Sequence, residues 1–428
     1  MEFVMRQKTH SATRSVDQRR QRHFRVLSRV ASAVATALRS LRFHRASLVN
    51  LLLLLLAACL ISVFYLEELS MTSPTKVKIV GPLVSDRIVR SGDKPLVGLG
   101  SKIDCRIEDQ AAGLLANAAG AFCDVANKEP ELLAIVGPDR LAKYLADDLN
   151  ARFNSVQFVA TADRTRASCI VPSSSGPVEA QQIFTMRSKI NQEATIAALD
   201  GLLDDCSHLL VGSMTAADDA LVNYVLGWMN RQPGNQSYLV LTGSQLQYPR
   251  RATQLANKAN WVQVNAAELQ KWTGVSGDVV SGIHRLREWG LGPYTSIIVT
   301  DGANGVYWYT NEGWGHQRAF QVSPQSDLAA GDTLTGTVLA GIAAGHDFRE
   351  AIRLGAAAAA MKVGGLRRRG GWDGLRDFAA NTPLLPIRPK RPIRRPMFPS
   401  NGFKIAGAAA VAAVMVGITI WKLMMAAT

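Results

Sequence analysis

Several short motifs that mark common enzyme classes are missing from the sequence. It has no G-x-x-x-x-G-K-[ST] loop, which excludes phosphate binding through a P-loop. HExxH, GxSxG and zinc-type Cys/His spacings are absent as well. Cysteine is scarce, and no two cysteines form a C-x-x-C pair. Such an odd and scattered set predicts buried free thiols in a reducing compartment, and its five members are Cys59, Cys105, Cys123, Cys169 and Cys206.

Acidic residues are scarce in two flanking segments. The chain of 428 residues carries 48 Lys and Arg against 34 Asp and Glu, which gives a formal net charge of +14. Much of this excess lies in residues 6–45 and 388–395. The central region is therefore closer to balance, which argues against nucleic acid as the main partner, although the basic flanks could still contact it.

Two long apolar segments predict membrane-spanning helices. Residues 48–66 are long enough to cross a bilayer, and a cleaved signal peptide is the alternative. Residues 404–424 form the second segment, with small residues spaced four apart, and a helix docked on the domain is its alternative. The preceding residues 1–47 form a basic amphipathic segment, which suits an anionic membrane surface or an organellar transit peptide.

The region between these segments, residues 77–382, has the pattern of one α/β domain. Residues 67–76 are expected to link it to the first apolar segment, and the Pro- and Arg-rich residues 383–403 to the second. Within it, apolar β-rich stretches alternate with helical ones, which predicts a mainly parallel sheet with ligands at the carboxyl ends of its strands. The predicted strands include residues 77–80, 132–136, 208–211, 238–241, 261–264 and 295–299.

One stretch joins small residues to a single carboxylate at a predicted helix start. Ala329, Ala330 and Gly331 put little side chain around the backbone, so N–H groups can point outward beside Asp332. Such donors stabilise a transferred phosphoryl group, while the carboxylate accepts the proton of an attacking hydroxyl. The alternative is that Asp332 only caps the helix. A glycine suited to the C′ position, Gly345, ends this helix, and a second helix is predicted over residues 348–363.

With the motifs around it, this stretch resembles the ribokinase-like carbohydrate kinases of the PfkB superfamily, over about residues 77–382. Residues 329–333 and the helix after them look like the family's C-terminal signature. The resemblance implies a three-layer αβα sandwich. It also implies Asp332 as catalytic base and the Ala329, Ala330 and Gly331 amides as the anion hole. The implied reaction is an ATP- and Mg²⁺-dependent phosphorylation of a hydroxyl on a sugar or nucleoside-like small molecule.

Two further motifs follow predicted strands in the family's order. Asn265-Ala266-Ala267-Glu268 is similar to the Asn-x-x-Glu motif, which implies that Asn265 and Glu268 organise Mg²⁺ and phosphate. Alone, this motif would predict a helix cap. Thr300-Asp301-Gly302-Ala303-Asn304-Gly305 resembles the nucleotide-binding Thr-x-Gly-x-x-Gly turn. The implied nucleotide contacts are Thr300, Gly302 and Gly305.

The amino-terminal half resembles the family less closely. Asp86 lies in a stretch similar to the family's first strand, and Gly113 and Asn117 lie where a substrate loop is expected. The resemblance implies that these three residues bind the substrate. Ala112 and Leu115 stand where the family often has glycine, and a branched side chain there would restrict the backbone and crowd a hydroxyl-rich ligand.

These departures leave more than one function open. Ser326-Asp327 replaces the usual Asp-Thr of a region that commonly contributes to a monovalent-cation site, so dependence on potassium is in doubt. A catalytically inactive kinase-like scaffold or binding protein at a membrane is the alternative to a membrane-anchored kinase, and a nucleic-acid-associated factor is a third hypothesis. The sequence leaves a homo-oligomer open. The need for ATP and the free thiols favour a kinase domain on the cytosolic or organelle-interior face.

Overall fold

The computed structural model describes residues 75–90, 106–172, 181–367 and 370–387. Its contacts divide the chain into the units Met1–Pro74 and Thr75–Thr428, and every described residue belongs to the second unit. Within the described ranges no helix is both long enough and apolar enough to cross a membrane. The basic segment 1–47 and the apolar segments 48–66 and 404–424 all lie outside those ranges, so their membrane roles stay predictions.

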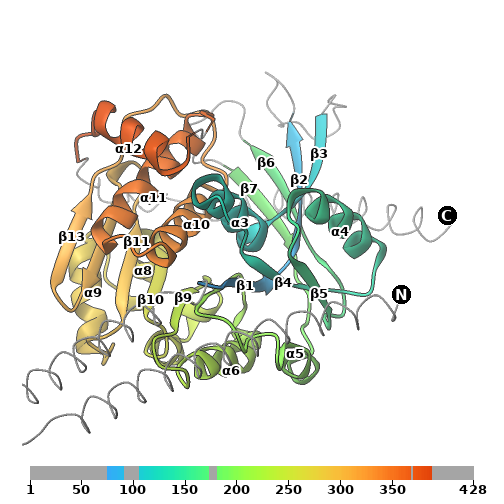
Figure 1. Ribbon diagram of the computed structural model, residues 1–428. Coiled ribbons are helices and arrows are strands. Elements are labelled where there is room, and N and C mark those ends of the chain that lie inside the picture. Colours follow the sequence, from blue (N-terminus) through green and yellow to red (C-terminus); the bar gives the residue numbers. More distant parts are fainter. Residues whose placement is uncertain (1–74, 91–105, 173–180, 368–369, 388–428) are drawn as a thin grey trace, which may run out of the picture. The chain divides into compact units, whose positions relative to one another are not determined.

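A nine-stranded sheet forms the centre of the second unit (Figure 1). Its strands are β1 (Val77–Pro82), β4 (Glu131–Val136), β5 (Val156–Ala160), β8 (His208–Val211), β9 (Gln236–Val240), β10 (Trp261–Asn265), β11 (Ser296–Thr300), β12 (Val306–Thr310) and β13 (Gly313–Gln317). Their spatial order is β13-β12-β11-β10-β9-β8-β1-β4-β5. Neighbours are parallel from β11 to β5, and only the β12–β13 hairpin adds antiparallel pairs.

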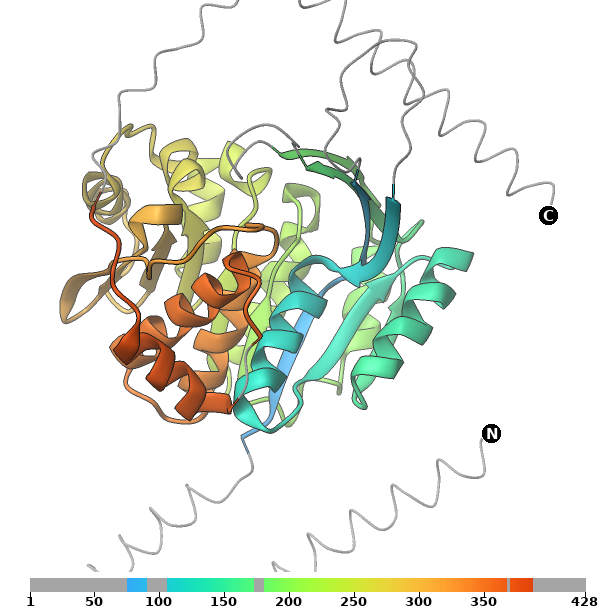
Figure 2. The ribbon, with the colours of Figure 1, turned by 90° about the horizontal axis from the view of Figure 1, so that it is seen from above.

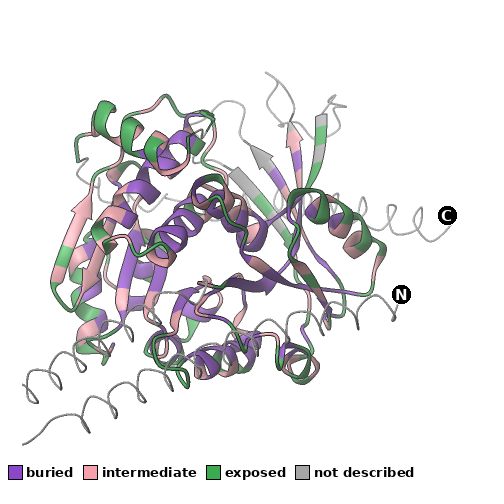
Figure 3. Ribbon diagram, viewed as in Figure 1, coloured by how far each residue is buried: buried purple, intermediate pink, exposed green. Residues whose placement is uncertain are grey.

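Each predicted strand is confirmed within about two residues at either end. The reason is burial on both faces, because a parallel strand covered by helices on both sides must be almost continuously apolar. Strand β1 illustrates this, since all of its residues are buried. The central strands are accordingly the most uniformly buried elements in Figure 3.

Helices cover the sheet in two layers, which Figure 2 shows from above. One layer contains α3 (Gly113–Ala126), α4 (Arg140–Arg152), α10 (Ala330–Ala343), α11 (Phe348–Val363) and α12 (Gly371–Asn381). The other contains α5 (Gln192–Leu199), α6 (Asp219–Met229), α7 (Pro249–Ala256), α8 (Ala266–Thr273) and α9 (Val279–Glu288). Each layer has its own apolar core against the sheet. The predicted three-layer αβα arrangement is therefore confirmed.

A second, four-stranded sheet stands out from the carboxyl end of β1 (Figure 1). Its strands are β2 (Val84–Arg90), β3 (Arg106–Ala112), β6 (Arg166–Pro172) and β7 (Gln181–Met186), in the order β3-β2-β6-β7. Asp86 lies in β2, the strand that follows the predicted first strand. The first strand ends at Pro82, which has no N–H to donate to a neighbouring strand. The chain then passes into the second sheet.

The predicted ends of α10 and α11 are confirmed. Gly345 follows α10 with a φ of 77°, the left-handed conformation that glycine adopts without strain. Asp347 caps α11, because its side chain accepts hydrogen bonds from the backbone N–H groups of Arg349 and Glu350. Glu350 forms an ion pair with Arg353 at 2.8 Å. The predicted helix over residues 348–363 is therefore confirmed.

Two smaller expectations need correction. The segment after residue 382 was predicted to be a solvated linker, yet its start pairs with the domain, since Leu385 N donates to Ala319 O at 2.8 Å and Gln321 N donates to Pro383 O at 2.7 Å. The described cysteines are free thiols as expected, but only Cys206 is fully buried, while Cys123 and Cys169 are half-buried.

Candidate active site

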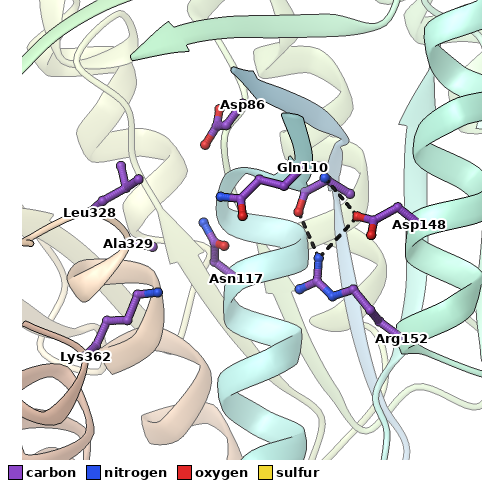
Figure 4. Close-up of a pocket in the computed structure, with 9 residues that line it drawn as sticks. Asp86, Gln110, Asn117, Asp148, Arg152, Leu328, Ala329 and Lys362 are labelled. Atoms are coloured by element: carbon purple, nitrogen blue, oxygen red, sulfur yellow. Dashed lines mark hydrogen bonds and ion pairs between the residues drawn. The ribbon is translucent and has the colours of Figure 1, made fainter. Parts of the chain in front are cut away.

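A cavity of about 320 Å³ lies near the amino-terminal ends of α3 and α10 (Figure 4). Residues from β2, β3, α3, α4, the loop before α10 and the last turn of α11 meet there. Its polar lining contains carboxylates, amides and cations, which is suited to a hydroxyl-rich or charged ligand. The lining residues are Asp86, Gln110, Ala111, Asn117, Asp148, Arg152, Leu328, Ala329 and Lys362.

The start of α10 forms the predicted anion-binding end only in part. Ala329 is the N-cap and adopts the left-handed conformation with a φ of 61°, which is costly for a residue other than glycine. The Ala330 N–H was expected to bind an anion, but it already donates to Asp327 O at 3.1 Å. Space in front of Gly331 is open, because an added Cβ would meet nothing within 4 Å. The amides best placed for an anion are therefore those of Gly331 and Asp332.

Asp332 is not the cap of α10, because it stands three residues beyond the cap residue Ala329 and its carboxylate turns elsewhere. The Asn117 amide Nδ2 donates to Asp332 Oδ2 at 2.9 Å. Burial raises the pKa of Asp332, while the hydrogen bond from Asn117 and the nearby charge of Lys362 act to lower it. A half-buried carboxylate oriented by an amide and a cation has the form of a general base.

Close packing of α3 on α10 brings Asn117 and Asp332 together. A Cβ on Gly336 would lie only 2.0 Å from the carbonyl oxygen of Ala118. Glycine is thus required where the two helices cross, one turn beyond Asp332 and next to Asn117. The small residues that the sequence shows in both helices set this distance.

Asp86 supplies the second carboxylate of the cavity, and Figure 4 shows it above Asn117. It pairs in register with Gln110 on β3 and with Ser168 on β6. Burial raises the pKa of Asp86 to about 6, the hydrogen bond with Ser168 opposes this shift, and the charge of Asp332 adds to it. The predicted substrate ligands Asp86 and Asn117 therefore meet in one pocket, beside the predicted base.

The residues expected to crowd the substrate do not do so. Leu115 and Ala112 are buried in the apolar core, so neither side chain lines the cavity. Gly113 begins α3 with a φ of 74°, and a Cβ there would approach Val84 Cγ2 to 2.8 Å. This turn explains the glycine, and its contact with the substrate stays a prediction. Leu115 crowds no ligand because, as a residue of α3, it turns inward.

Asp148 and Arg152 form a part of the site that sequence reasoning missed. Both lie on α4 and bind the backbone N–H and C=O of Ala111 on β3. Ala111 N donates to Asp148 Oδ2, and Arg152 Nη1 donates to Ala111 O, each at 2.9 Å. Figure 4 shows this clamp. The i, i+4 spacing of opposite charges was the only local signal, and it is equally typical of any solvated helix face.

Asn265 and Glu268 lie outside this cavity, at the carboxyl end of β10. They form a reciprocal cap on α8, in which Glu268 N donates to Asn265 Oδ1 at 2.8 Å and Asn265 N donates to Glu268 Oε2 at 2.9 Å. Burial raises the pKa of Glu268, and the Asn265 backbone hydrogen bond opposes this. The helix-cap reading is thus correct, and it leaves further lone pairs on the carboxylate for the waters of a hydrated cation.

The predicted nucleotide turn stands beside the Asn265 motif, because Asn265 and Thr300 are register partners on β10 and β11. The turn from β11 to β12 needs both of its glycines. Gly302 has a φ of 53° and Gly305 a φ of 99°, and a Cβ on Gly305 would lie 2.0 Å from Gln317 O. The hairpin itself therefore explains these glycines, and a nucleotide contact remains a prediction.

The described ranges contain no group of three or more His, Cys, Asp or Glu side chains that could hold a metal ion. Mg²⁺ commonly keeps several waters and takes only one or two carboxylates besides substrate phosphates. Glu268 with Asn265 fits such a hydrated ion and does not fit an ion enclosed by protein ligands.

Comparison with known proteins identifies the class to which this fold and site belong. Residues 104–367 match the family model described as "pfkB family carbohydrate kinase". The chain therefore belongs to the pfkB family of carbohydrate kinases.

Individual relatives are more distant. The chain is 30% identical over 110 residues to 1-phosphofructokinase of Escherichia coli K12, which is 24% of this chain and 34% of that protein. The match to 1-phosphofructokinase of Shigella flexneri has the same extent, so the chain spans about a third of the length of these curated relatives.

Solved structures show the same fold across nearly their whole length. A ribokinase from Thermotoga maritima has a TM-score of 0.56 at 18% identity, covering 72% of this chain and 100% of that one. Phosphofructokinase-2 from Escherichia coli has a TM-score of 0.58 at 18% identity, covering 72% and 98% respectively. A putative ribokinase from Agrobacterium tumefaciens reaches 0.57 at 22% identity, covering 72% and 99%. These likenesses concern the fold.

Proposed function

We propose that the protein is an ATP-dependent kinase that transfers the γ-phosphoryl group to a hydroxyl of a sugar or nucleoside-like small molecule. The observation that carries this proposal is that Asp86 and Asn117 line one polar cavity at the start of α10, and that Asn117 donates a hydrogen bond to Asp332 beside it. Membership of a carbohydrate kinase family supports it, as do relatives named 1-phosphofructokinase and ribokinase.

The geometry suggests how the chain's own residues would act. Asp332 accepts the proton of the acceptor hydroxyl while that oxygen forms a bond to the γ-phosphorus. The bond from this phosphorus to the β–γ bridging oxygen breaks, and ADP leaves with the electron pair. The amides of Gly331 and Asp332 face the charge on the transferred group. Asp86 and Asn117 bind other hydroxyls of the acceptor and so fix which hydroxyl reaches the base.

Nucleotide and metal are assigned to the neighbouring strand ends. Thr300, Gly302 and Gly305 would contact ATP, while Asn265 and Glu268 would hold a hydrated Mg²⁺ through its waters. When bound, such an ion neutralises phosphate charge. The arrangement is supported by the register pairing of Asn265 with Thr300, which puts both motifs at the same edge of the central sheet.

The test is ATP turnover by the full chain, in detergent, against a panel of sugars, sugar phosphates and nucleosides. We expect one acceptor class to stimulate ADP release strongly, and Asp332→Asn to abolish that stimulation. The inactive scaffold is the competing outcome. Leu115, Ala112, Ser326 and the apolar segments motivate it, and of these Leu115 and Ala112 are core residues. A folded protein that binds Mg-ATP yet consumes none with any acceptor would contradict the kinase proposal.

We also propose that residues 48–66 and 404–424 anchor the domain to a membrane, with the kinase domain on the cytosolic or organelle-interior face. Apolar length and the basic flanks support this, and both segments lie outside the described residues. Alkaline washing of membranes should leave the protein in the pellet. Release by that wash, or digestion of the domain by protease added outside intact cells or organelles, would contradict it.

A further inference from the structure

The last turn of α11 reaches the cavity that lies beside the base. Helix α10 starts at the cavity, the chain turns back after Gly345, and α11 returns antiparallel, so that Lys362 lines the cavity. Figure 4 shows the Lys362 side chain extended into the pocket next to Ala329, on the side facing Asn117. The Lys362 side chain is exposed there, which leaves its ammonium group within reach of a ligand.

Backbone contacts fix this helix end against the loop that leads to the base. Gln325 N and Ser326 N both donate to Val363 O, at 2.8 Å and 3.2 Å. Gly365 ends the helix with a φ of 63°, and its Cα approaches the Gln325 side chain so closely that a Cβ would lie 2.1 Å from Oε1. The loop that carries Ala329 and the residue that follows Lys362 are therefore tied together.

Because α11 ends at the cavity, Lys362 offsets the negative partial charge of its C-terminus there. A helix C-terminus carries about half a negative charge, which repels a phosphate. Here that negative end faces the cavity in which the phosphoryl group must be transferred. A lysine in this turn reverses the sign of the local charge.

We propose that Lys362 is a further catalytic residue, whose ammonium group donates hydrogen bonds to the transferred phosphoryl group and stabilises the charge on its oxygens. This inference rests on the proposed kinase function. Lys362 stays protonated throughout, since the proton of the acceptor hydroxyl goes to Asp332 and the electron pair leaves with ADP. A lysine that only stabilises the helix end is the competing explanation.

The experiment compares the full-length wild type with Lys362→Met, Lys362→Arg and the control Lys128→Met. Methionine keeps the length and apolar stem of the side chain and removes its charge. Lys128 is exposed just beyond the C-terminal end of α3, at the opposite end from the cavity, so the same substitution there should leave turnover unchanged. The readouts are kcat, the KM of the acceptor, the pH profile of kcat/KM and the thermal midpoint.

We expect Lys362→Met to lower kcat by about 10²-fold, the size of effect seen when one donor to a developing negative charge is removed. The acceptor KM and the thermal midpoint should change little, because the lysine acts on the transferred group. Lys362→Arg should recover most of the loss, because it restores the positive charge.

The pH profile distinguishes an electrostatic effect of Lys362 on Asp332 from a role that only stabilises the end of α11. The charged groups that line the cavity beside Asp332 are Asp86 from β2, Asp148 and Arg152 from α4, and Lys362 from α11, and Asp86 and Lys362 act electrostatically on Asp332. Removing the Lys362 charge should move the acidic limb of kcat/KM to higher pH, since that charge favours the ionised base. The arginine variant should keep the wild-type limb.

Two results would overturn the inference. If Lys362→Met keeps kcat within about twofold of the wild type, Lys362 is not catalytic, although the kinase proposal stands. If both variants lose activity together with thermal stability, and the acidic limb does not move, the lysine only supports the helix end. A wild type that transfers no phosphoryl group to any acceptor would overturn both proposals, and this outcome is visible before any variant is compared.

Discussion

Asn117 and Asp332 lie 215 positions apart in the chain, yet Asn117 Nδ2 donates a 2.9 Å hydrogen bond to Asp332 Oδ2. One residue belongs to α3 and the other to α10, so the relative position of these two helices decides whether the bond forms. The hydrogen bond favours the ionised form of a carboxylate that burial makes harder to ionise. The amide thus both orients the proposed base and tunes it.

Replacing Asn117 with Ala should lower kcat by about 10-fold to 10²-fold, because a carboxylate that loses its orienting partner spends less time in line with the acceptor hydroxyl. The pKa of Asp332 should rise, since the lost hydrogen bond had lowered it. The acidic limb of kcat/KM should therefore move to higher pH. An unchanged limb in a folded variant would mean that Asn117 does not act on the base.

Replacing Asp332 with Asn should separate activity from stability. A proton acceptor is worth about 10² to 10⁴ in rate, so turnover should fall to the detection limit. Burial raises the pKa of Asp332, so at neutral pH the folded state carries a charged group that it disfavours. The neutral amide removes that cost and can still accept from Asn117. We therefore expect an equal or higher thermal midpoint at pH 7, and a large decrease would show that the carboxylate is structural.

Local patterns account for most of what the sequence predicted. Strands β4, β8 and β10 are apolar runs because helices bury them on both faces, and that requirement acts on each residue separately. The ends of α10 and α11 were predictable for a similar reason, since Gly345 and Asp347 satisfy geometric demands of the chain beside them. The proposed base was predictable because small residues and a carboxylate are contiguous there.

Contacts between distant segments explain what the sequence did not predict. The Asp148 and Arg152 clamp on Ala111 depends on how α4 lies against β3, and an i, i+4 charge pair contains no information about that. Lys362 reaches the cavity only because α11 returns antiparallel to α10. Conversely, Leu115 was predicted to crowd a ligand from its position in a motif, but the rotation of α3 buries it. The sequence of Asn265 and Glu268 alone predicts the helix cap that forms, and only the family resemblance adds a metal role.

Asp86 should give the enzyme a second pH dependence. Its pKa lies at about 6 in the folded protein, above the ordinary value of 3.8, chiefly because of burial. As a carboxylate it accepts hydrogen bonds from acceptor hydroxyls, so the acceptor KM should rise as the pH falls below about 6. Asp86→Asn should flatten this rise, and a KM profile that is identical in the two proteins would contradict the assignment.

The same shift predicts a pH dependence of stability. A carboxyl group whose pKa is raised on folding adds stability that is fully present below its unfolded pKa and is lost as the pH rises through its folded pKa. The wild type should therefore lose stability relative to Asp86→Asn between about pH 4 and pH 7. Thermal midpoints of both proteins at pH 4 and pH 8 test this, because their difference should shift in favour of the variant at the higher pH.

The crossing of α3 and α10 predicts a large effect from a single methyl group. In Gly336→Ala the new Cβ would start 2.0 Å from Ala118 O, so the helices must separate. Overpacking of this kind costs about 1 to 3 kcal/mol of unfolding free energy. Separation also lengthens the bond from Asn117 to Asp332, so kcat should fall more than the loss of stability alone explains. Gly227→Ala in α6 is the matched control, because a Cβ there meets nothing within 4 Å and should be neutral or stabilising. Equal kcat values in the two folded variants would show that the helix crossing does not set the geometry of the base.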